Sequence, residues 1–285
     1  MEKINIAGVT LAGVAQGGWQ TTIYVPEVRA VFDAGAPLPG GVDHLFVTHG
    51  HSDHIGALPY IVARRRIYRN KKTFNVYLPA EIVGPVQTML DAMLLIDHDN
   101  DENGKSPHGP VGLTPMVPGN VIQLRKQTAV RALKTYHRGP SLGWAIEQTT
   151  AKLKPEFRGK NGAEIGRLRQ EGVQVTNDVM STTLVVSGDT RIEFFLETEQ
   201  VRKAKVLVHE ITVWESDDKN IEGARHYGHT HVAEMAEHCE KFEGEYLVLV
   251  HRSMRYSRLE AEAMIKERFP SSMLDKIVLF DGGDR

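Results

Sequence analysis

One short stretch of the chain, residues 48–59 (THGHSDHIGALP), gathers four side chains that can bind a metal ion. His49, His51, Asp53 and His54 lie within six positions, directly after the apolar residues 45–47. A buried polar group without a partner costs about 2–7 kcal/mol, so all four cannot be ordinary core residues. A bound cation would satisfy them together, and His with Asp in the absence of thiolates suits zinc, manganese or iron. The stretch therefore predicts a metal site rather than a polar turn that happens to be rich in histidine.

Apolar runs later in the chain end on titratable side chains in the same way. Such runs stop at His137, at Asp189, at His209 followed by Glu210, and at His251. In layered α/β proteins, sites collect at strand ends, where loops are exposed but rigidly anchored. We therefore expect these strand ends to meet at one edge of a β-sandwich.

The resulting set of candidate metal ligands has seven members. It comprises five histidines and two aspartates: His49, His51, His54, His137, His251, Asp53 and Asp189. Seven protein ligands exceed what one tetrahedral ion takes, and they suit two ions that share a carboxylate. With a bridging hydroxide the centre would keep a charge of about +1, which favours an anionic phosphodiester and its more anionic transition state. His and Asp ligands accommodate Zn²⁺, Mn²⁺, Fe²⁺ or Co²⁺, so the set does not fix the metal.

The overall composition is that of an ordinary globular protein. The chain has 285 residues, of which 41% are hydrophobic and 25% charged, so a sizeable core can be buried. A net charge of −2 excludes a wholesale polybasic nucleic-acid binder but allows local basic patches. Cys239 is the only cysteine, which excludes an intramolecular disulfide and favours a reducing compartment. The N-terminal residues resemble neither a signal peptide nor a membrane span, so we expect a cytoplasmic protein without a membrane partner.

The elements that must position the candidate ligands alternate between strands and helices. Glycine-bounded or β-branched runs predict strands over residues 4–9, 21–25, 30–32, 43–47, 74–78, 121–124, 129–136, 182–186, 204–208, 245–250 and 276–280. Helical spacing of apolar residues predicts helices from residue 55 onward and over residues 80–96, 232–242 and 258–269. No shift in composition marks a boundary, so one domain over residues 1–285 is expected.

Three polar segments interrupt this pattern. Residues 63–72 carry six basic residues and no acidic one, which fits either a solvated helix end or a phosphate-contacting patch. Residues 97–119 are expected to be an irregular loop, in which His98 and His108 are solvated rather than ligands. Residues 151–172 form a second polar insertion, with six Lys or Arg against three Glu.

The order of these motifs resembles that of the metallo-β-lactamase superfamily, whose signature is similar to THGHSDHIGALP. HEIT at residues 209–212, GHTH at 228–231 and HRSMRY at 251–256 resemble motifs of ribonuclease Z, the tRNA 3′-processing endonuclease. GGWQTTIYVPEVRAVFDAG and KLKPEF are similar to the short, plant-type branch of that family, the latter where the branch carries its reduced arm. Ile211 and Met254 stand where that family usually has alanine, and HTH stands in place of HST.

The resemblance implies an α/β fold, the metallo-β-lactamase αββα sandwich, in which two packed mixed β-sheets are flanked by helices. The basic segment at residues 151–172 would be a short insertion in this domain. Two divalent metal ions, with Zn²⁺ the first choice, would be held by two sets of side chains with a shared carboxylate. These sets are His49, His51 and His137 for one ion, Asp53, His54 and His251 for the other, and Asp189 between them.

The activity implied is that of an endoribonuclease that removes the 3′ trailer of precursor tRNA, working as a homodimer whose arm grips tRNA for the neighbouring subunit. Asp53 would orient the bridging hydroxide for attack, and His229, held by Glu210, would protonate the leaving 3′-oxygen. Independently of the family, a carboxylate at the end of a buried strand can orient an imidazole and raise its pKa, although Glu210 also fits a helix cap. Only the family match selects His229 over His231, and His209 is either a partner of a ligand or a buried strand residue.

Two alternatives are left open by the residues. A phosphodiesterase of the same superfamily that acts on small diesters would share the metal centre, but it would tolerate charge reversal in the basic insertion. A catalytically silent RNA-binding or scaffolding member would be expected to lose metal ligands first, whereas this chain carries the whole set.

Overall fold

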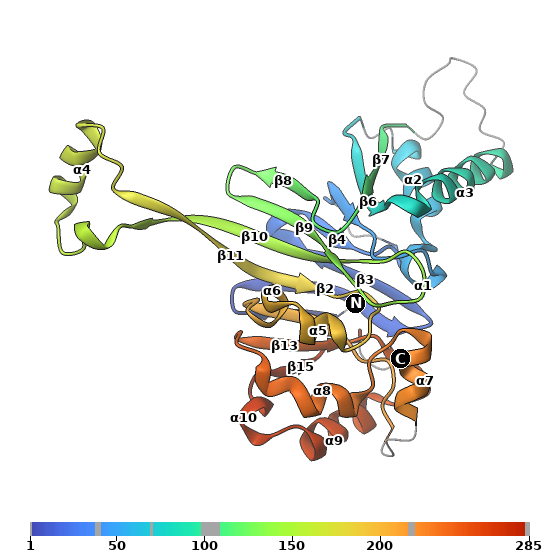
Figure 1. Cartoon of the computed structure of the whole chain (residues 1–285). Coiled ribbons are helices and arrows are strands. Elements are labelled where there is room, and N and C mark those ends of the chain that lie inside the picture. The colour runs from blue at the N-terminus through green and yellow to red at the C-terminus, as the bar shows by residue number, and fades with distance from the viewer. Residues whose placement is uncertain (1, 38–40, 69–70, 98–108, 216–219, 283–285) are drawn as a thin grey trace.

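The computed structural model describes residues 2–37, 41–68, 71–97, 109–215 and 220–282. It shows two mixed β-sheets packed face to face, with helices on both outer faces, so the predicted αββα sandwich is confirmed (Figure 1). His98 and His108, which were predicted to be solvated, lie outside the described residues. Within the described part of the chain, no helix combines the length and the hydropathy needed to cross a membrane.

The first sheet contains the N-terminal part of the chain and becomes parallel toward its far edge. Its described strands follow in the order β1 (Glu2–Ile6), β2 (Val9–Gly17), β3 (Gln20–Val25), β4 (Ala30–Phe32), β5 (His44–Phe46), β6 (Phe74–Pro79) and β7 (Val111–Met116), with β14 (Arg252–Ser253) beside β2. Strands β1 to β4 pair in antiparallel fashion, whereas β4 to β7 pair in parallel.

The second sheet contains the remaining strands and is also mixed. In spatial order its described strands are β15 (Ile277–Leu279), β13 (Tyr246–Val250), β12 (Val206–Glu210), β11 (Thr176–Val186), β10 (Leu142–Leu153), β9 (Thr128–Lys134) and β8 (Val121–Arg125). Strands β11, β12, β13 and β15 pair in parallel, and β8 to β11 pair in antiparallel fashion.

The core has three layers, one between the two sheets and one between each sheet and its helices. Side chains alternate between these layers along each strand. In β12, Val206 and Val208 face the other sheet, while Leu207 faces the helices, because successive side chains point to opposite faces. Between the sheets, the rings of Phe46 and Trp144 have centroids 5.0 Å apart. Helices α2 (Leu58–Ile67) and α3 (Val83–Ile96) cover the first sheet, and the second is covered by α5 (Glu193–Glu197), α6 (Glu199–Arg202), α8 (Val232–His238), α9 (Arg258–Arg268) and α10 (Ser271–Leu274).

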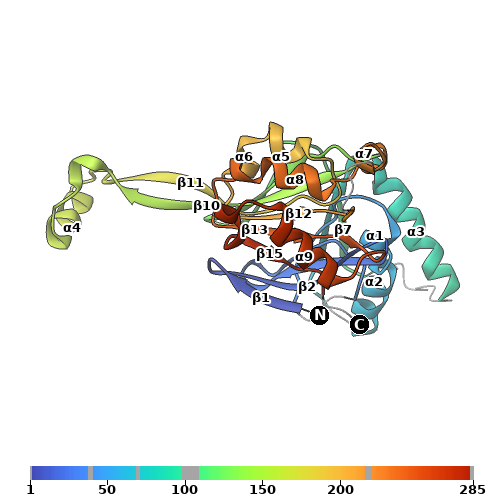
Figure 2. The ribbon, with the colours of Figure 1, turned by 90° about the horizontal axis from the view of Figure 1, so that it is seen from below.

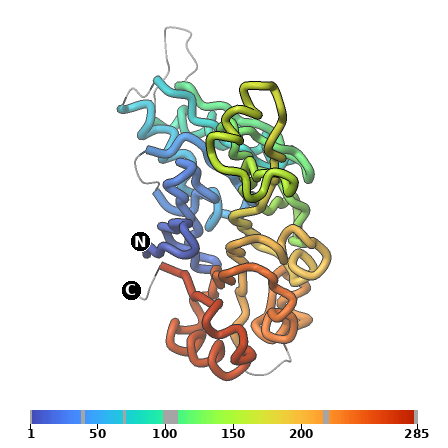
Figure 3. The backbone as a smooth tube through the Cα atoms, turned by 90° about the vertical axis from the view of Figure 1, so that its left-hand side faces the viewer, coloured from blue at the N-terminus to red at the C-terminus, as the bar shows by residue number. Residues whose placement is uncertain are grey.

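Strands β10 and β11 continue beyond the sandwich as a long hairpin, here called the arm (residues 149–180). The arm carries α4 (Gly162–Gln170) near its tip and extends far from the body (Figures 1 and 2), and Figure 3 views the molecule from this side. The Asn161 side chain accepts the backbone N–H of Glu164, and Glu164 accepts the N–H of Asn161, a capping box that fixes the start of α4. The arm is therefore an ordered element, although little of it is buried.

Two predictions about elements were wrong in detail, and one strand was not predicted. Residues 4–9 are not one strand, because Ala7 and Gly8 adopt positive φ angles of 50° and 77° and turn the chain between β1 and β2. Residues 97–119 are not wholly irregular, because residues 111–116 form β7 and pair with β6. In addition, no pattern had indicated β10, whose last three residues begin the predicted polar insertion at residues 151–172, and this insertion lies on the arm.

Candidate metal centre

The strand ends converge, as the sequence predicted, because the strands that carry them run in one direction. Strand β9 runs the same way as β11, since both pair in antiparallel fashion with β10. The residues that end or follow these parallel-running strands are Asp33 after β4, His49 after β5, His137 after β9, Asp189 after β11, Glu210 at the end of β12 and His251 after β13. Helix α1 (Ser52–Ile55) adds Asp53 and His54 at the same end.

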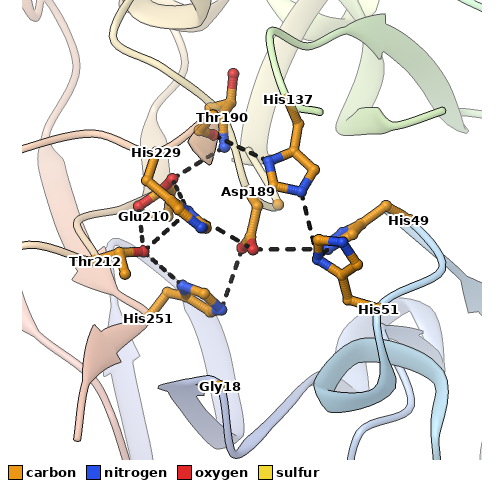
Figure 4. Close-up of polar contacts among 12 residues, drawn as sticks. Gly18, His49, His51, His137, Asp189, Thr190, Glu210, Thr212, His229 and His251 are labelled. Carbon is orange, nitrogen blue, oxygen red and sulfur yellow. Dashed lines mark hydrogen bonds and ion pairs between the residues drawn. The ribbon is translucent and has the colours of Figure 1, made fainter. Parts of the chain in front are cut away.

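The seven candidate ligands fall into two groups that share one end of the sandwich. Figure 4 labels five of them: His49, His51, His137, Asp189 and His251. Within each group, the ligand atoms lie within 4.8 Å of one another. The groups are His49, His51, His137 and Asp189, and then Asp53, His54 and His251. Asp189 lies between them, because its Oδ2 is 3.6 Å from His49 Nε2 and its Oδ1 is 3.2 Å from His251 Nε2.

The nitrogen and oxygen atoms at this centre are arranged to bind cations rather than to form hydrogen bonds with one another. The buried Oδ1 of Asp189 has no hydrogen-bond partner among the described residues. His54 Nε2 lies 3.1 Å from His251 Nε2, while their Nδ1 atoms face the oxygens of Asp33 and Thr212 at 2.8 Å. With each Nδ1–H directed at an oxygen, two lone pairs face each other, an arrangement that a cation satisfies. Two ligands at about 2.1 Å from a tetrahedral ion lie about 3.4 Å apart, close to these separations.

The electrostatics of three of the candidate ligands, Asp53, His49 and His137, also suit a metal. Burial alone would raise the pKa of Asp53, but the nearby imidazoles of His251 and His54 lower it to about 2. Burial lowers the pKa of His49 well below its usual value, and it lowers the pKa of His137 as well. An ionised carboxylate and neutral imidazoles are the species that coordinate metal ions, so little proton release would be needed from these groups.

A buried carboxylate supports the ligand His54 from the side away from the centre. Asp33, which is 1% exposed, has its Oδ2 2.8 Å from His54 Nδ1. The same carboxylate accepts the backbone N–H of Thr48 at 2.7 Å and its hydroxyl at 2.8 Å. Asp33 has a positive φ of 62°, a conformation that costs energy in a non-glycine residue and persists where the surroundings fix it. Asp33 therefore orients the His54 ring and ties it to the loop that carries His49.

Glu210 and His229 form a second charged pair beside Asp189. Glu210 is fully buried, and its Oε1 lies 3.0 Å from His229 Nδ1 and 3.1 Å and 3.2 Å from the backbone nitrogens of Thr190 and Thr230. Burial alone would lower the pKa of His229, but the charge and hydrogen bond of Glu210 raise it to about 9. His229 Nδ1 is 3.8 Å from Asp189 Oδ2, so a protonated imidazole is held at the edge of the candidate metal centre.

The two other histidines of these motifs have different surroundings. His209 lies on the opposite face of β12 from Glu210, with its ring 6.0 Å from that of Phe194 in the helix-covered layer. His231 begins α8, where its Nδ1 accepts the backbone N–H of Ala233 at 3.1 Å. Of the two interpretations left open for His209, the structure supports the buried strand residue, and it places His229 rather than His231 beside Asp189.

Three supporting residues were not singled out by the sequence patterns. Asp33 follows a strand, as the ligands do, and that signal could have identified it. Thr212 belongs to HEIT, and its hydroxyl, which donates to Glu210 Oε2 at 2.8 Å, also lies 2.8 Å from His251 Nδ1. Gly188 has a φ of 61°, and a Cβ at this position would lie 2.5 Å from the Cβ of Thr48, so only glycine lets Asp189 approach the His49 loop.

Comparisons with known proteins agree with this architecture. The family model described as the metallo-beta-lactamase superfamily matches residues 33–69. The tRNase Z TRZ1 of Arabidopsis thaliana is 36% identical over 269 residues, which cover 92% of this chain and 92% of the relative. The chloroplastic tRNase Z TRZ2 of the same plant is 30% identical over 92% of this chain and 73% of that relative. The crystal structure of the short form of human tRNase Z has the same fold, with a TM-score of 0.56 and 17% identity over 96% of each chain. The chain therefore belongs to the tRNase Z (ribonuclease Z) family of the metallo-β-lactamase superfamily.

Proposed function

We propose that this protein is a metal-dependent endoribonuclease that removes the 3′ trailer of precursor tRNA. The observation that carries the proposal is the Glu210–His229 pair beside the His/Asp cluster, because metal-assisted hydrolysis of an RNA diester uses a cation site together with a proton donor for the alkoxide leaving group. The 36% identity to a relative named tRNase Z, over 92% of the chain, supports the RNA substrate.

The seven ligands would be divided between two ions as the resemblance implies. One ion would be held by His49, His51 and His137, the other by Asp53, His54 and His251, with Asp189 shared. When bound, the ions supply Lewis acidity, which lowers the pKa of a water molecule and neutralises charge that develops on the phosphate. We propose zinc, because five of the seven ligands are imidazoles without thiolates; elemental analysis of protein purified without chelators tests this assignment.

The reaction would use side chains on either side of Asp189. Asp53, ionised and fixed by the Gly18 N–H at 2.8 Å, would orient the attacking hydroxide, which is left when water releases a proton to solvent. As the bond from phosphorus to the 3′-oxygen breaks, His229 donates a proton to that oxygen, and Glu210 stabilises the imidazolium before transfer. The products are a 3′-hydroxyl on the tRNA and a 5′-phosphate on the trailer, in which all atoms of the added water are accounted for.

The position of the arm supports a homodimer. Strand β10 leaves the metal end at Leu142 and runs twelve residues to Leu153, which places the outer part of the arm, from Leu153 onward, about 40 Å from the site of its own chain. A basic surface at this distance would bind the substrate of its own metal site less readily than that of a second copy, if the arm of each copy lies close to the metal site of the other. We propose that two copies pair through exposed apolar side chains at the ends of α2 and α3, among them Ile67, Tyr68 and Leu95. Light scattering that gives the mass of one chain would contradict this.

The basic segment at residues 63–72 has more of its charges in contacts with other side chains than the basic segment on the arm. In the segment 63–72, Lys72 Nζ lies 2.5 Å from Asp43 and Arg66 lies 3.4 Å from Asp97, and the Arg65 guanidinium lies over the ring of Phe74. These contacts favour the helix-end interpretation for this segment. The arm carries the other basic set, and we propose that it is the main phosphate-binding surface.

The direct test is incubation with a precursor tRNA. We expect purified protein supplied with Zn²⁺, Mn²⁺ or Co²⁺ to release the trailer by one cut that leaves a 3′-hydroxyl. Parallel measurement on bis-p-nitrophenyl phosphate separates this activity from that of a small-diester phosphodiesterase. Failure to release the trailer with any of these metals would end the proposal. A cytoplasmic location, expected from the sequence, is proposed as well, and imaging of the tagged full chain tests it.

A further inference from the structure

A cavity of about 780 Å³ opens beside the metal centre on the side of His229. His51 and His229 form part of its wall next to the candidate ions. The wall also includes Tyr227, the last residue of α7 (Ile221–Tyr227), and Arg138, which directly follows the candidate ligand His137. The cavity is thus continuous with the site but extends past the residues that the chemistry requires.

Tyr227 is an unusual residue for a wall of this kind. Its side chain is 59% exposed, whereas most large hydrophobic side chains in the described chain are buried. The guanidinium of Arg138 lies 5.6 Å from the centroid of the Tyr227 ring, which holds the ring in place by a cation–π contact. A fixed, exposed aromatic ring next to a cation is the surface on which unpaired RNA bases stack.

The chemistry of the site fixes which base could reach this ring. In the proposed reaction His229 protonates the leaving 3′-oxygen, which belongs to the ribose on the 5′ side of the cut. The nucleotide next to His229 is therefore the last nucleotide of the tRNA product and not the first of the trailer. Tyr227 is two residues from His229 in sequence and lines the same cavity, so it is an aromatic side chain close to the place of that nucleotide.

We propose that Tyr227, held by Arg138, is the stacking platform for the unpaired base on the 5′ side of the scissile phosphate. This inference rests on the proposed function and assigns a positioning residue for it. Because stacking is tolerant of base identity, the platform would fix the phosphate over the ions without selecting a sequence. Arg138 and Arg255, which also line the cavity, supply positive charge for the backbone around this nucleotide.

The test combines a protein variant with a substrate variant. Precursor tRNA with a normal nucleotide before the cut is compared with one that carries an abasic ribose there, using metal-loaded protein. We expect Tyr227→Leu to lower kcat/KM on the normal substrate roughly 5- to 150-fold, and to have no further effect on the abasic substrate. Tyr227→Phe, which keeps the ring, should retain activity. Tyr60→Leu is the matched control, because Tyr60 is 54% exposed but lies on α2, away from the cavity.

An equal loss on both substrates would overturn the proposal, since it would show that the ring only supports the structure. The wild-type protein gives a second measurement that does not depend on folding of a variant. Product tRNA ending in 2-aminopurine should lose fluorescence on binding, because stacking on the tyrosine quenches it, and binding without quenching would overturn the proposal. If wild-type protein releases no trailer from either substrate, the proposed function fails and this inference falls with it. Cleavage that is insensitive to Tyr227→Leu removes the inference alone.

Discussion

The two ends of the β10–β11 pair show how differently one hairpin can be used. At one end Leu142 and Val186 are buried in the core, and the residues just beyond them lead into a centre where most charged side chains have at least one fixed partner. At the other end the same two strands leave the sandwich and carry exposed basic residues on a hairpin with little core. Catalytic groups must be held to fractions of an ångström, whereas phosphate attraction requires only charge at the right distance. The comparison predicts that substitutions at the metal end change chemistry and metal affinity, while those on the arm change only the binding of RNA.

The largest effect is expected at the shared carboxylate. Asp189→Ala removes the one side chain that lies between the two ligand groups, so both candidate ions lose a ligand. We expect kcat/KM on precursor tRNA to fall on the order of 10³-fold or more, together with the metal content by elemental analysis. Asp178→Ala, at an exposed carboxylate on β11, the strand that leads to Asp189, is the control and should keep its metal. An Asp189→Ala protein that retains two ions per chain would contradict the assignment.

The next effect separates proton donation from metal binding. Glu210→Gln removes the charge that raises the pKa of His229 to about 9, so this pKa falls. A general acid must be protonated, and kcat declines as the pH rises through its pKa, so the alkaline limb of the pH profile should move to lower pH. We expect a loss of about 10²-fold in kcat on precursor tRNA. Bis-p-nitrophenyl phosphate, whose leaving group needs no proton, should be cleaved almost as before, and an equal loss on both substrates would argue against general acid catalysis.

A smaller effect is expected from the residue that supports His54. Asp33→Asn keeps the size of the side chain and tolerates the positive φ of 62°, but it removes the charge beside the imidazole. Loss of such a supporting hydrogen bond typically weakens metal affinity about 10- to 100-fold, which competition with a fluorescent chelator measures. Asp43→Asn, at a carboxylate that directly precedes β5 and pairs with Arg29, should leave metal affinity unchanged. Activity that excess metal does not restore would indicate that Asp33 supports the fold instead.

The sequence predicted the metal end far better than the arm, for a physical reason. Side chains such as His137, Asp189 and His251 follow apolar runs because each is positioned by a buried strand. An apolar run followed by a titratable residue can be recognised in the sequence. The alternation of Val206, Leu207 and Val208 likewise predicts both the strand and its two faces. What the sequence could not indicate was distance: only the folded chain shows that Thr212 lies 2.8 Å from His251, thirty-nine positions away.

Strand β10 was missed for the opposite reason. Its first six residues are buried, but from Gln148 onward its side chains are mostly exposed on both faces, so the polar alternation that marks a half-buried strand is absent. The arm is held by backbone pairing with β11, for example Thr149 with Met180 and Leu153 with Thr176, and that pairing leaves no trace in side-chain pattern. Helix α4 was missed for a similar reason, since none of its residues is buried.

The smallest effect is expected on the arm, and it tests the comparison most sharply. Lys160→Ala removes one exposed charge near α4 without touching any buried group. If the arm only attracts phosphates, KM for precursor tRNA should rise a few-fold with kcat unchanged, and the slope of log KM against log salt concentration should fall by about one if Lys160 contacts one phosphate. Glu156→Gln, which removes a negative charge from the same arm, should shift KM the other way. Both substitutions should leave the rate of bis-p-nitrophenyl phosphate hydrolysis unchanged, because this diester is cleaved at the metal centre, about 40 Å from the substituted residues. A parallel fall on both substrates would mean that the two ends of the hairpin are mechanically coupled and that their division of labour does not hold.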